Sequence, residues 1–108
     1  MIKKFENFNN NEMVDTIKDI CLELEDEGFD VRHNWINETT IMKGTGAKHV
    51  LFDYNEVKEV IDRLREYLGD RLISISASNG SGWVDIRRLQ LRSIENPLLS
   101  ALKISYSI

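Results

Sequence analysis

A chain of 108 residues suits one domain with a buried core, and its 42% apolar and 30% charged residues are typical of a soluble globular protein. Its formal net charge of -4 argues against a general nucleic-acid binder, because such proteins gain most of their affinity by neutralising phosphates. No apolar run approaches the roughly 20 residues of a membrane span, and the lone cysteine, Cys21, cannot form an internal disulfide. We therefore expect one cytoplasmic domain over residues 1–108, with no membrane partner.

The first predicted helix covers residues 9–27 and follows a short lead. Asn9 is placed to cap its first turn, and Glu12, three residues further on, would complete a capping box. Gly28 favours the left-handed conformation that ends many helices. Apolar side chains recur here at three- and four-residue steps, which predicts one buried stripe. Its members are Met13, Val14, Ile17, Ile20, Cys21 and Leu24.

A hairpin is predicted after this helix. Residues 29–36 alternate between apolar and polar side chains, residues 37–38 have the character of a turn, and residues 39–43 read as the second strand. Two glycines within residues 44–46 interrupt the chain again. Residues 48–52 form either a third short strand or an extended entry to the next helix. The face of the first strand that we expect to be buried holds Phe29, Val31, His33 and Trp35.

The strongest pattern in the sequence is a second helix within residues 52–69. Asp53 can cap its first turn, and Glu56 three residues on can reach back to complete a capping box. Gly69 supplies the stop. The opposite face of this helix is charged, so one stripe is predicted to be buried. It consists of Val57, Val60, Ile61, Leu64, Tyr67 and Leu68.

The chain after the second helix is predicted to form another hairpin. Residues 71–77 alternate as a strand, and residues 78–82 form a loop of Gly, Asn and Ser. Residues 83–91 read as the return strand, and their alternation changes phase near residues 87–88, which indicates a bulge. One face of the first of these strands would hold Ile73, Ile75 and Ala77, and the other Leu72, Ser74 and Ser76.

Two further elements are predicted near the C-terminus. Asn96 and Pro97 can begin a brief helix that runs through Leu102. Residues 102–108 then alternate as a final strand, and the side chains that face outward from it are small or polar. If this strand lies at the edge of the sheet, its free backbone groups can pair with a second copy and form a homodimer. If it lies centrally, it offers no such edge.

These elements predict an α+β fold, a two-layer sandwich in which two helices pack on one face of an antiparallel sheet in the order α-β-β-α-β-β-β. Both predicted helix starts share the pattern F-x-x-N-E-apolar, at residues 8–13 and 52–57. A duplicated helix–strand–strand unit would explain this similarity. The shared capping mechanism explains it as well, and we favour that interpretation.

Few residues have the spacing of catalytic or metal-binding groups. His33 and His49 are the only histidines, and no HxH, HExxH or CxxC motif accompanies them, so we expect neither a metal nor a cofactor. His33 is interpreted as a partly buried structural residue, and Cys21 as a small buried hydrophobe. Gly44, Gly46, Lys48 and His49 would be the residues of a nucleotide-binding enzyme, the third functional hypothesis, although a plain hairpin loop is favoured there.

Two charged segments are candidates for contact with a partner. Residues 22–30 are strongly acidic and form either a contact surface for a basic partner or divalent ion, or a solvated face, which is favoured. Basic and aromatic residues come together in the C-terminal third, where they can bind a protein or stack on nucleic acid, or protect an edge strand from aggregation. The candidate binding residues are Trp83, Arg87, Arg88, Arg92 and Arg71.

The opening segment MIKKFENF and the later segment ICLELEDEGFDV resemble small proteins encoded by bacteriophages. The resemblance covers about the first third of the chain and carries over no functional residue. It implies a host cytoplasm and a role in binding a partner such as a host enzyme or a defence component. We therefore expect a non-enzymatic interaction protein with a protein partner, and nucleic-acid binding through the C-terminal arginines is the main alternative.

Overall fold

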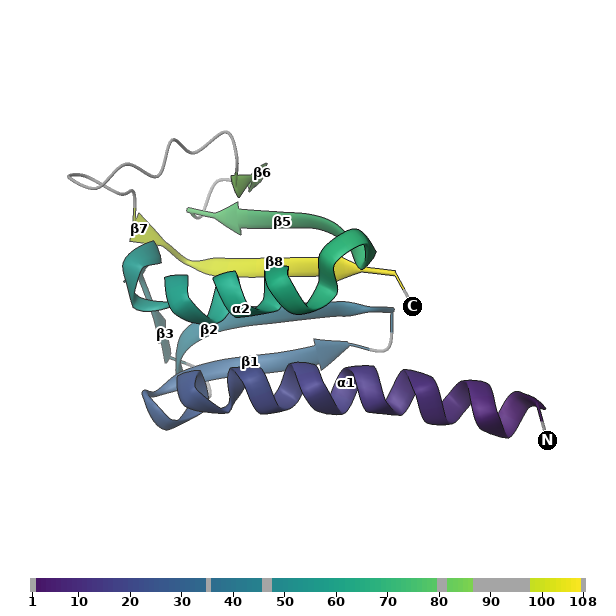
Figure 1. Cartoon of the computed structure of the whole chain (residues 1–108). Coiled ribbons are helices and arrows are strands. Elements are labelled where there is room, and N and C mark those ends of the chain that lie inside the picture. The colour runs from purple at the N-terminus through teal and green to yellow at the C-terminus, as the bar shows by residue number, and fades with distance from the viewer. Residues whose placement is uncertain (1, 35, 46–47, 80–81, 87–97, 108) are drawn as a thin grey trace.

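The fold is taken from a computed structural model (Figure 1). It describes residues 2–34, 36–45, 48–79, 82–86 and 98–107, with backbone alone for residues 2–11 and 45. The helices are α1 (Ile2–Asp26) and α2 (Lys58–Leu68), with short 3-10 helices at Tyr54–Glu56 and Gly69–Arg71. The strands are β1 (Phe29–Asn34), β2 (Glu38–Thr45), β3 (Lys48–Val50), β4 (Phe52–Asp53), β5 (Leu72–Ser78), β6 (Trp83–Asp85), β7 (Leu98–Leu99) and β8 (Ala101–Tyr106).

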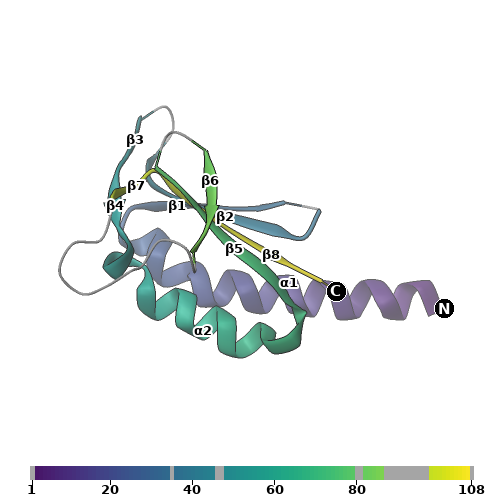
Figure 2. The ribbon, with the colours of Figure 1, turned by 90° about the horizontal axis from the view of Figure 1, so that it is seen from above.

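Both helices lie on the same face of an antiparallel sheet, as Figure 2 shows from above. The order of the paired strands is β1-β2-β8-β5-β6, with β3 also paired to β2, and β4 pairs with β7 in a separate two-stranded sheet. The predicted α+β sandwich of two layers is therefore confirmed. Its core lies between the helices and the sheet, where Ile17, Leu64, Ile41, Leu102 and Ile104 are at most 1% exposed.

The first helix is longer than its sequence pattern predicts. α1 begins at Ile2, so Asn9 lies inside the helix and the cap predicted there is wrong. No proline or glycine precedes Asn9, so nothing in residues 2–8 interrupts the helical backbone. The first turns of α1 extend past the ends of the strands (Figure 2). The predicted stripe is confirmed from Met13 to Leu24, with Ile20 and Val14 partly exposed, and Gly28 ends the helix at φ +91°.

The capping box at the second helix is confirmed, but it caps the 3-10 turn that leads into α2. The Asp53 side chain accepts a hydrogen bond from the Asn55 N–H at 2.8 Å, and Glu56 Oε2 accepts one from the Asp53 N–H at 2.9 Å. The buried stripe of α2 is also confirmed except at Tyr67, which is 40% exposed. Gly69, at φ +53°, follows the last residue of α2.

A bulge in β5 leaves the side chain of one residue, Ile73, exposed instead of buried. Leu72 opposes Tyr106, whereas Ser74 opposes Ser105, so Ile73 is an extra residue in β5 relative to β8. Because a bulge interrupts the alternation of side chains, Ile73 is 66% exposed while Ile75 and Ala77 are buried. The prediction that Ile73 shares one face with Ile75 and Ala77 is therefore wrong.

The strand near the C-terminus lies in the middle of the sheet. β8 pairs with β2 on one side and with β5 on the other, so it offers no free edge, and the homodimer predicted to form through such an edge loses its basis. The predicted brief helix is also wrong, because residues 98–99 and 101–102 belong to strands β7 and β8. Leu99 opposes Phe52 and Leu102 opposes Ile41, and all four side chains are buried. Trp35, Asn96, Pro97, Ile108 and the bulge predicted at residues 87–88 lie outside the described residues.

Candidate binding surface on the open sheet face

One face of the six-stranded sheet packs on the helices, and the opposite face, here called the open face, has no helix over it in the described part of the chain (Figure 2). Residues that oppose each other in a ladder project to the same side. Ser76 opposes both Lys103 and Asp85, and Lys103 also opposes Thr40. By this register the open face carries Asp30, Arg32, Glu38, Thr40, Ser74, Ser76, Ser78, Trp83, Asp85, Lys103 and Ser105.

Trp83 is the largest side chain on the open face, and Lys103 holds it in place. The Lys103 Nζ atom lies 4.4 Å from the centre of the Trp83 ring, a cation–π contact. The two residues belong to β6 and β8, and the small side chains of Ser76 and Ser78 on the intervening β5 leave room for this contact. Trp83 is nevertheless 47% exposed, so the surface presents a positioned aromatic ring to solvent.

The basic side chains of the described open face are both matched by carboxylates. Arg32 Nη2 lies 3.0 Å from Asp30 Oδ2, and Lys103 Nζ lies 3.8 Å from Glu38 Oε2. His49 Nε2 lies 3.1 Å from the same oxygen of Asp30. Hydrogen bonds from Arg32 and then His49 lower the pKa of Asp30, so this carboxyl is charged at neutral pH. The described part of the face therefore has little positive charge left for phosphate groups.

Of the five candidate binding residues predicted from sequence, the structure describes Arg71 and Trp83, and these two do not lie together. Arg71 precedes β5, and Trp83 opposes Ser78 at the other end of that strand, so the two residues lie at opposite ends of β5. The Arg71 side chain instead donates to Met13 Sδ at 3.7 Å. Arg87, Arg88 and Arg92 lie outside the described residues, so their part in a binding site stays a prediction.

The surroundings of the two candidate reactive residues, His33 and Cys21, are those of residues with a structural role. His33 Nδ1 lies 3.0 Å from Thr39 Oγ1, and burial lowers the pKa of this imidazole, which confirms its interpretation as a partly buried residue. Cys21 is 0% exposed, and burial raises its pKa to about 12, as expected for an inert thiol. Within the described residues, no group of three or more His, Cys, Asp or Glu side chains could hold a metal ion.

Gly44 has a structural role in the β2–β3 hairpin. It adopts φ +109° and opposes His49, and a Cβ atom at this position would lie 2.2 Å from the Lys48 carbonyl oxygen. Only glycine fits so close an approach of two backbones. The close approach of the two backbones explains why position 44 is a glycine, with no need for a bound nucleotide. Gly46 lies outside the described residues.

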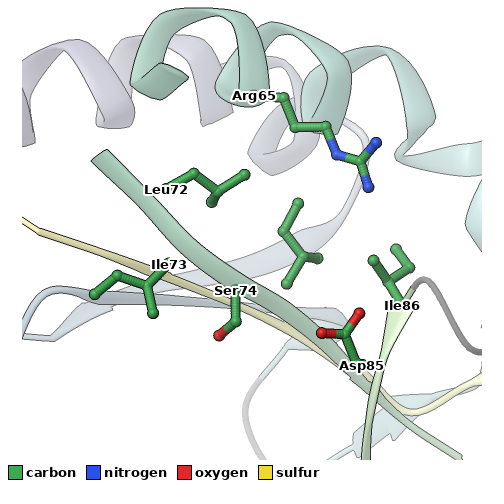
Figure 3. A pocket seen from close by; sticks show the side chains of 7 residues that line it. Arg65, Leu72, Ile73, Ser74, Asp85 and Ile86 are labelled. Carbon is green, nitrogen blue, oxygen red and sulfur yellow. The ribbon is translucent and has the colours of Figure 1, made fainter. Parts of the chain in front are cut away.

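Among the described residues, one hollow borders the open face at Ser74 and Asp85, and another lies between the helices. The first, of about 350 Å³, is a groove beside β5 (Figure 3) and is lined by Arg65, Leu72, Ile73, Ser74, Ile75, Asp85 and Ile86. The second, of about 340 Å³, lies between the end of α1 and the start of α2 and is lined by Glu23, Leu24, Glu27, Asn55, Glu56, Lys58, Glu59 and Val60. Part of the acidic segment 22–30 thus borders the second hollow, where Glu23 also forms an ion pair with Arg63.

Sequence reasoning missed Lys103, Glu38 and Arg65 as parts of candidate sites. The alternation of residues 102–108 places Lys103 on an outward face, but its contacts depend on the order of the strands.

Comparisons with protein-family models, curated proteins and solved structures find no significant match. No helix in the described part of the chain is both long and apolar enough to cross a membrane.

Proposed function

We propose that this protein is a small non-enzymatic interaction protein that binds a protein partner through the open face, with Trp83 on the edge strand β6 as the main contact residue. The observation that carries the proposal is that Trp83 is half-exposed and yet fixed by Lys103. Tryptophan is the residue type most enriched at binding hot spots. A side chain that is already positioned loses less conformational entropy when a partner covers it.

The charges of the open face favour a protein partner over nucleic acid. Binding to nucleic acid needs several basic groups that can exchange counterions for phosphates. Here Arg32 and Lys103 already lie beside Asp30 and Glu38. The main alternative, binding through the C-terminal arginines, would produce an affinity for single-stranded DNA that falls steeply as salt rises. The resemblance to phage-encoded proteins suggests a host enzyme or a defence component as the partner.

A quantitative pull-down tests this proposal. The full chain, a Trp83→Ala variant and a Tyr67→Ala variant are immobilised and exposed to bacterial lysate. Tyr67 is a matched control because it is a similarly exposed aromatic residue that lies on α2, away from the open face. We expect one stoichiometric protein partner that the Tyr67→Ala variant retains and the Trp83→Ala variant loses by roughly ten-fold or more in affinity. Absence of any stoichiometric partner, or equal retention by both variants, would contradict the proposal.

A further inference from the structure

β1 is the edge strand of the sheet at the opposite side from β6. It pairs with β2 along its whole length, from Phe29 to Asn34, and no strand in the described part of the chain pairs with its outer side. A chain that started from Ile86, after β6, would have to cross five strand spacings of about 4.8 Å to reach that side and then return to Leu98, near the central strand β8. Residues 87–97 span about 40 Å at most, so no length would remain to pair along β1.

The register of the β1–β2 hairpin determines which backbone groups of β1 face outward. The Gly44 N–H donates to Gly28 O at 2.9 Å, so these two residues form a hydrogen-bonded pair. In an antiparallel ladder such pairs alternate with pairs whose backbone groups point away from each other. The N–H and C=O groups of Phe29, Val31 and His33 therefore point away from β2, and no hydrogen bond among the described residues uses them.

α1 lies beside this edge, on the helix-covered side of the sheet (Figures 1 and 2). One flank of α1 faces α2, because Glu23 forms an ion pair with Arg63. Another flank faces β1 near His33, because burial and then the positive charge of Lys18 lower the pKa of this imidazole. α1 and β1 run in opposite directions and are joined by the turn at residues 27–28, so the end of α1 lies near the start of β1.

The flank of α1 at this edge combines apolar surface with an acidic end. Val14, Lys18, Cys21 and Glu25 recur at three- and four-residue steps and so share this flank, and Val14 is only partly buried. Residues 25–27 are all acidic, and the last turn of α1 contains no basic residue. None of the ion pairs among the described residues uses these three carboxylates. The negative end of the helix dipole is therefore left without a cation.

We propose that the outer edge of β1 receives an extended segment of a partner protein, which pairs antiparallel with β1 and places a basic side chain beside Glu25. An added strand bonds the free backbone groups of an edge, and its alternate side chains give specificity. The side chains opposite Phe29, Val31 and His33 face α1, so apolar ones cover Val14 and a basic one opposite Phe29 reaches the acidic end of the helix. This edge lies across the sheet from β6, so the site stands or falls independently of the role proposed for Trp83.

Synthetic peptides of about seven residues test the proposal. Each carries a fluorophore, and its binding to the full chain is followed by fluorescence anisotropy. In the first peptide, threonine occupies the odd positions, valine the second and fourth, and lysine the sixth, so that the lysine is opposite Phe29 when the fourth residue is opposite Val31. A second peptide exchanges the lysine with the first valine, which brings the lysine beside Lys18 instead. We expect the first peptide to bind with a micromolar dissociation constant and the second to bind roughly five-fold more weakly or worse.

N-methylation separates backbone pairing from other modes of binding. In the proposed register the amides of the even positions bond to β1, and those of the odd positions point away from it. Methylation of the even amides of the first peptide should abolish binding, whereas methylation of the odd amides should leave it unchanged. Equal effects of the two methylation patterns, or failure of the native chain to bind the unmethylated peptide, would overturn the proposal.

A Glu25→Lys variant tests the charge at the end of α1. It should weaken binding of the first peptide by roughly five- to ten-fold and remove its advantage over the second. This variant should fold, because a cation near the end of a helix is favourable. Glu12→Lys is the matched control, because it makes the same change at an exposed position more than three turns away on the same helix, and Trp83→Ala should bind both peptides as the native chain does. Equal losses in Glu12→Lys and Glu25→Lys, or no loss in Glu25→Lys, would contradict the proposal.

Discussion

The Lys103 Nζ atom lies 4.4 Å from the centre of the Trp83 ring, although the strands that carry these residues are separated by β5. The contact therefore spans three strands on the open face and ties the short edge strand β6 to the centre of the sheet. It also leaves the Trp83 side chain 47% exposed.

A double-mutant cycle measures the strength of this contact. Trp83→Ala, Lys103→Ala and the double variant are unfolded in urea at moderate salt. A cation–π pair at an exposed site contributes about 0.5–1 kcal/mol, and we expect a coupling energy in that range. Strictly additive effects of the two substitutions would mean that the ring and the ammonium group do not interact in solution.

The bulge in β5 predicts different outcomes for two isoleucines that a regular alternation would treat alike. Ile75→Ala should lower the free energy of unfolding by about 2–5 kcal/mol, because it removes a buried side chain. Ile73→Ala should change it by no more than about 0.5 kcal/mol, because Ile73 is mostly exposed. Chemical denaturation decides between the two patterns, and equal losses would place both side chains in the core.

The thiol of Cys21 should be unreactive in the native protein. It is fully buried, and its pKa is raised to about 12, so the thiolate is scarce at neutral pH. Ellman's reagent at neutral pH should label Cys21 only after denaturant is added. Complete labelling of the folded chain within the mixing time would show that the end of α1 opens readily.

The carboxylate of Glu56 should make folding stability depend on acid pH. Its pKa is lowered from 4.5, first by a hydrogen bond from Lys43 Nζ at 2.5 Å and then by the Asp53 N–H. Because the folded pKa lies below the unfolded one, the stabilisation is fully present above pH 4.5 and is lost as the pH falls through the folded value.

A Glu56→Gln variant measures this effect. It should be less stable than the native chain at neutral pH, and the difference should shrink as acid neutralises Glu56 in the native protein. Urea titrations at a series of pH values follow it, with Glu66→Gln, the same change at an exposed position on α2, as the control. A difference in stability that stays constant down to pH 3 would contradict the role given to the carboxylate.

Local patterns in the sequence predict much of this fold. The capping box of Asp53 and Glu56, the stops at Gly28 and Gly69, and the stripe of α1 depend on neighbours within a few residues, so the sequence alone reveals them. The start of α1 is not predictable in this way. A capping residue such as Asn9 marks the start of a helix only where the residues before it are not helical. In this protein residues 2–8 are helical, so Asn9 lies inside α1.

The candidate sites depend on contacts that are distant in the sequence. The extra residue at Ile73 is visible only in the register of β5 against β8, and the contact between Lys103 and Trp83 only in the order of the strands. The sequence identifies Trp83 as a candidate because of its type. It contains no local signal that Arg65 borders a groove beside β5.

The central position of β8 has a consequence for the order of folding. β2 and β5 are held together through residues 101–106, which are synthesised after both of them. On the ribosome, the hairpin β1–β2 and the segment from α2 to β5 can form local structure, but the sheet cannot close until β8 has emerged. Such a topology has a high contact order, and proteins of this kind fold slowly for their size. The apolar stripes of both helices therefore lack their complete sheet until the last strand has been synthesised.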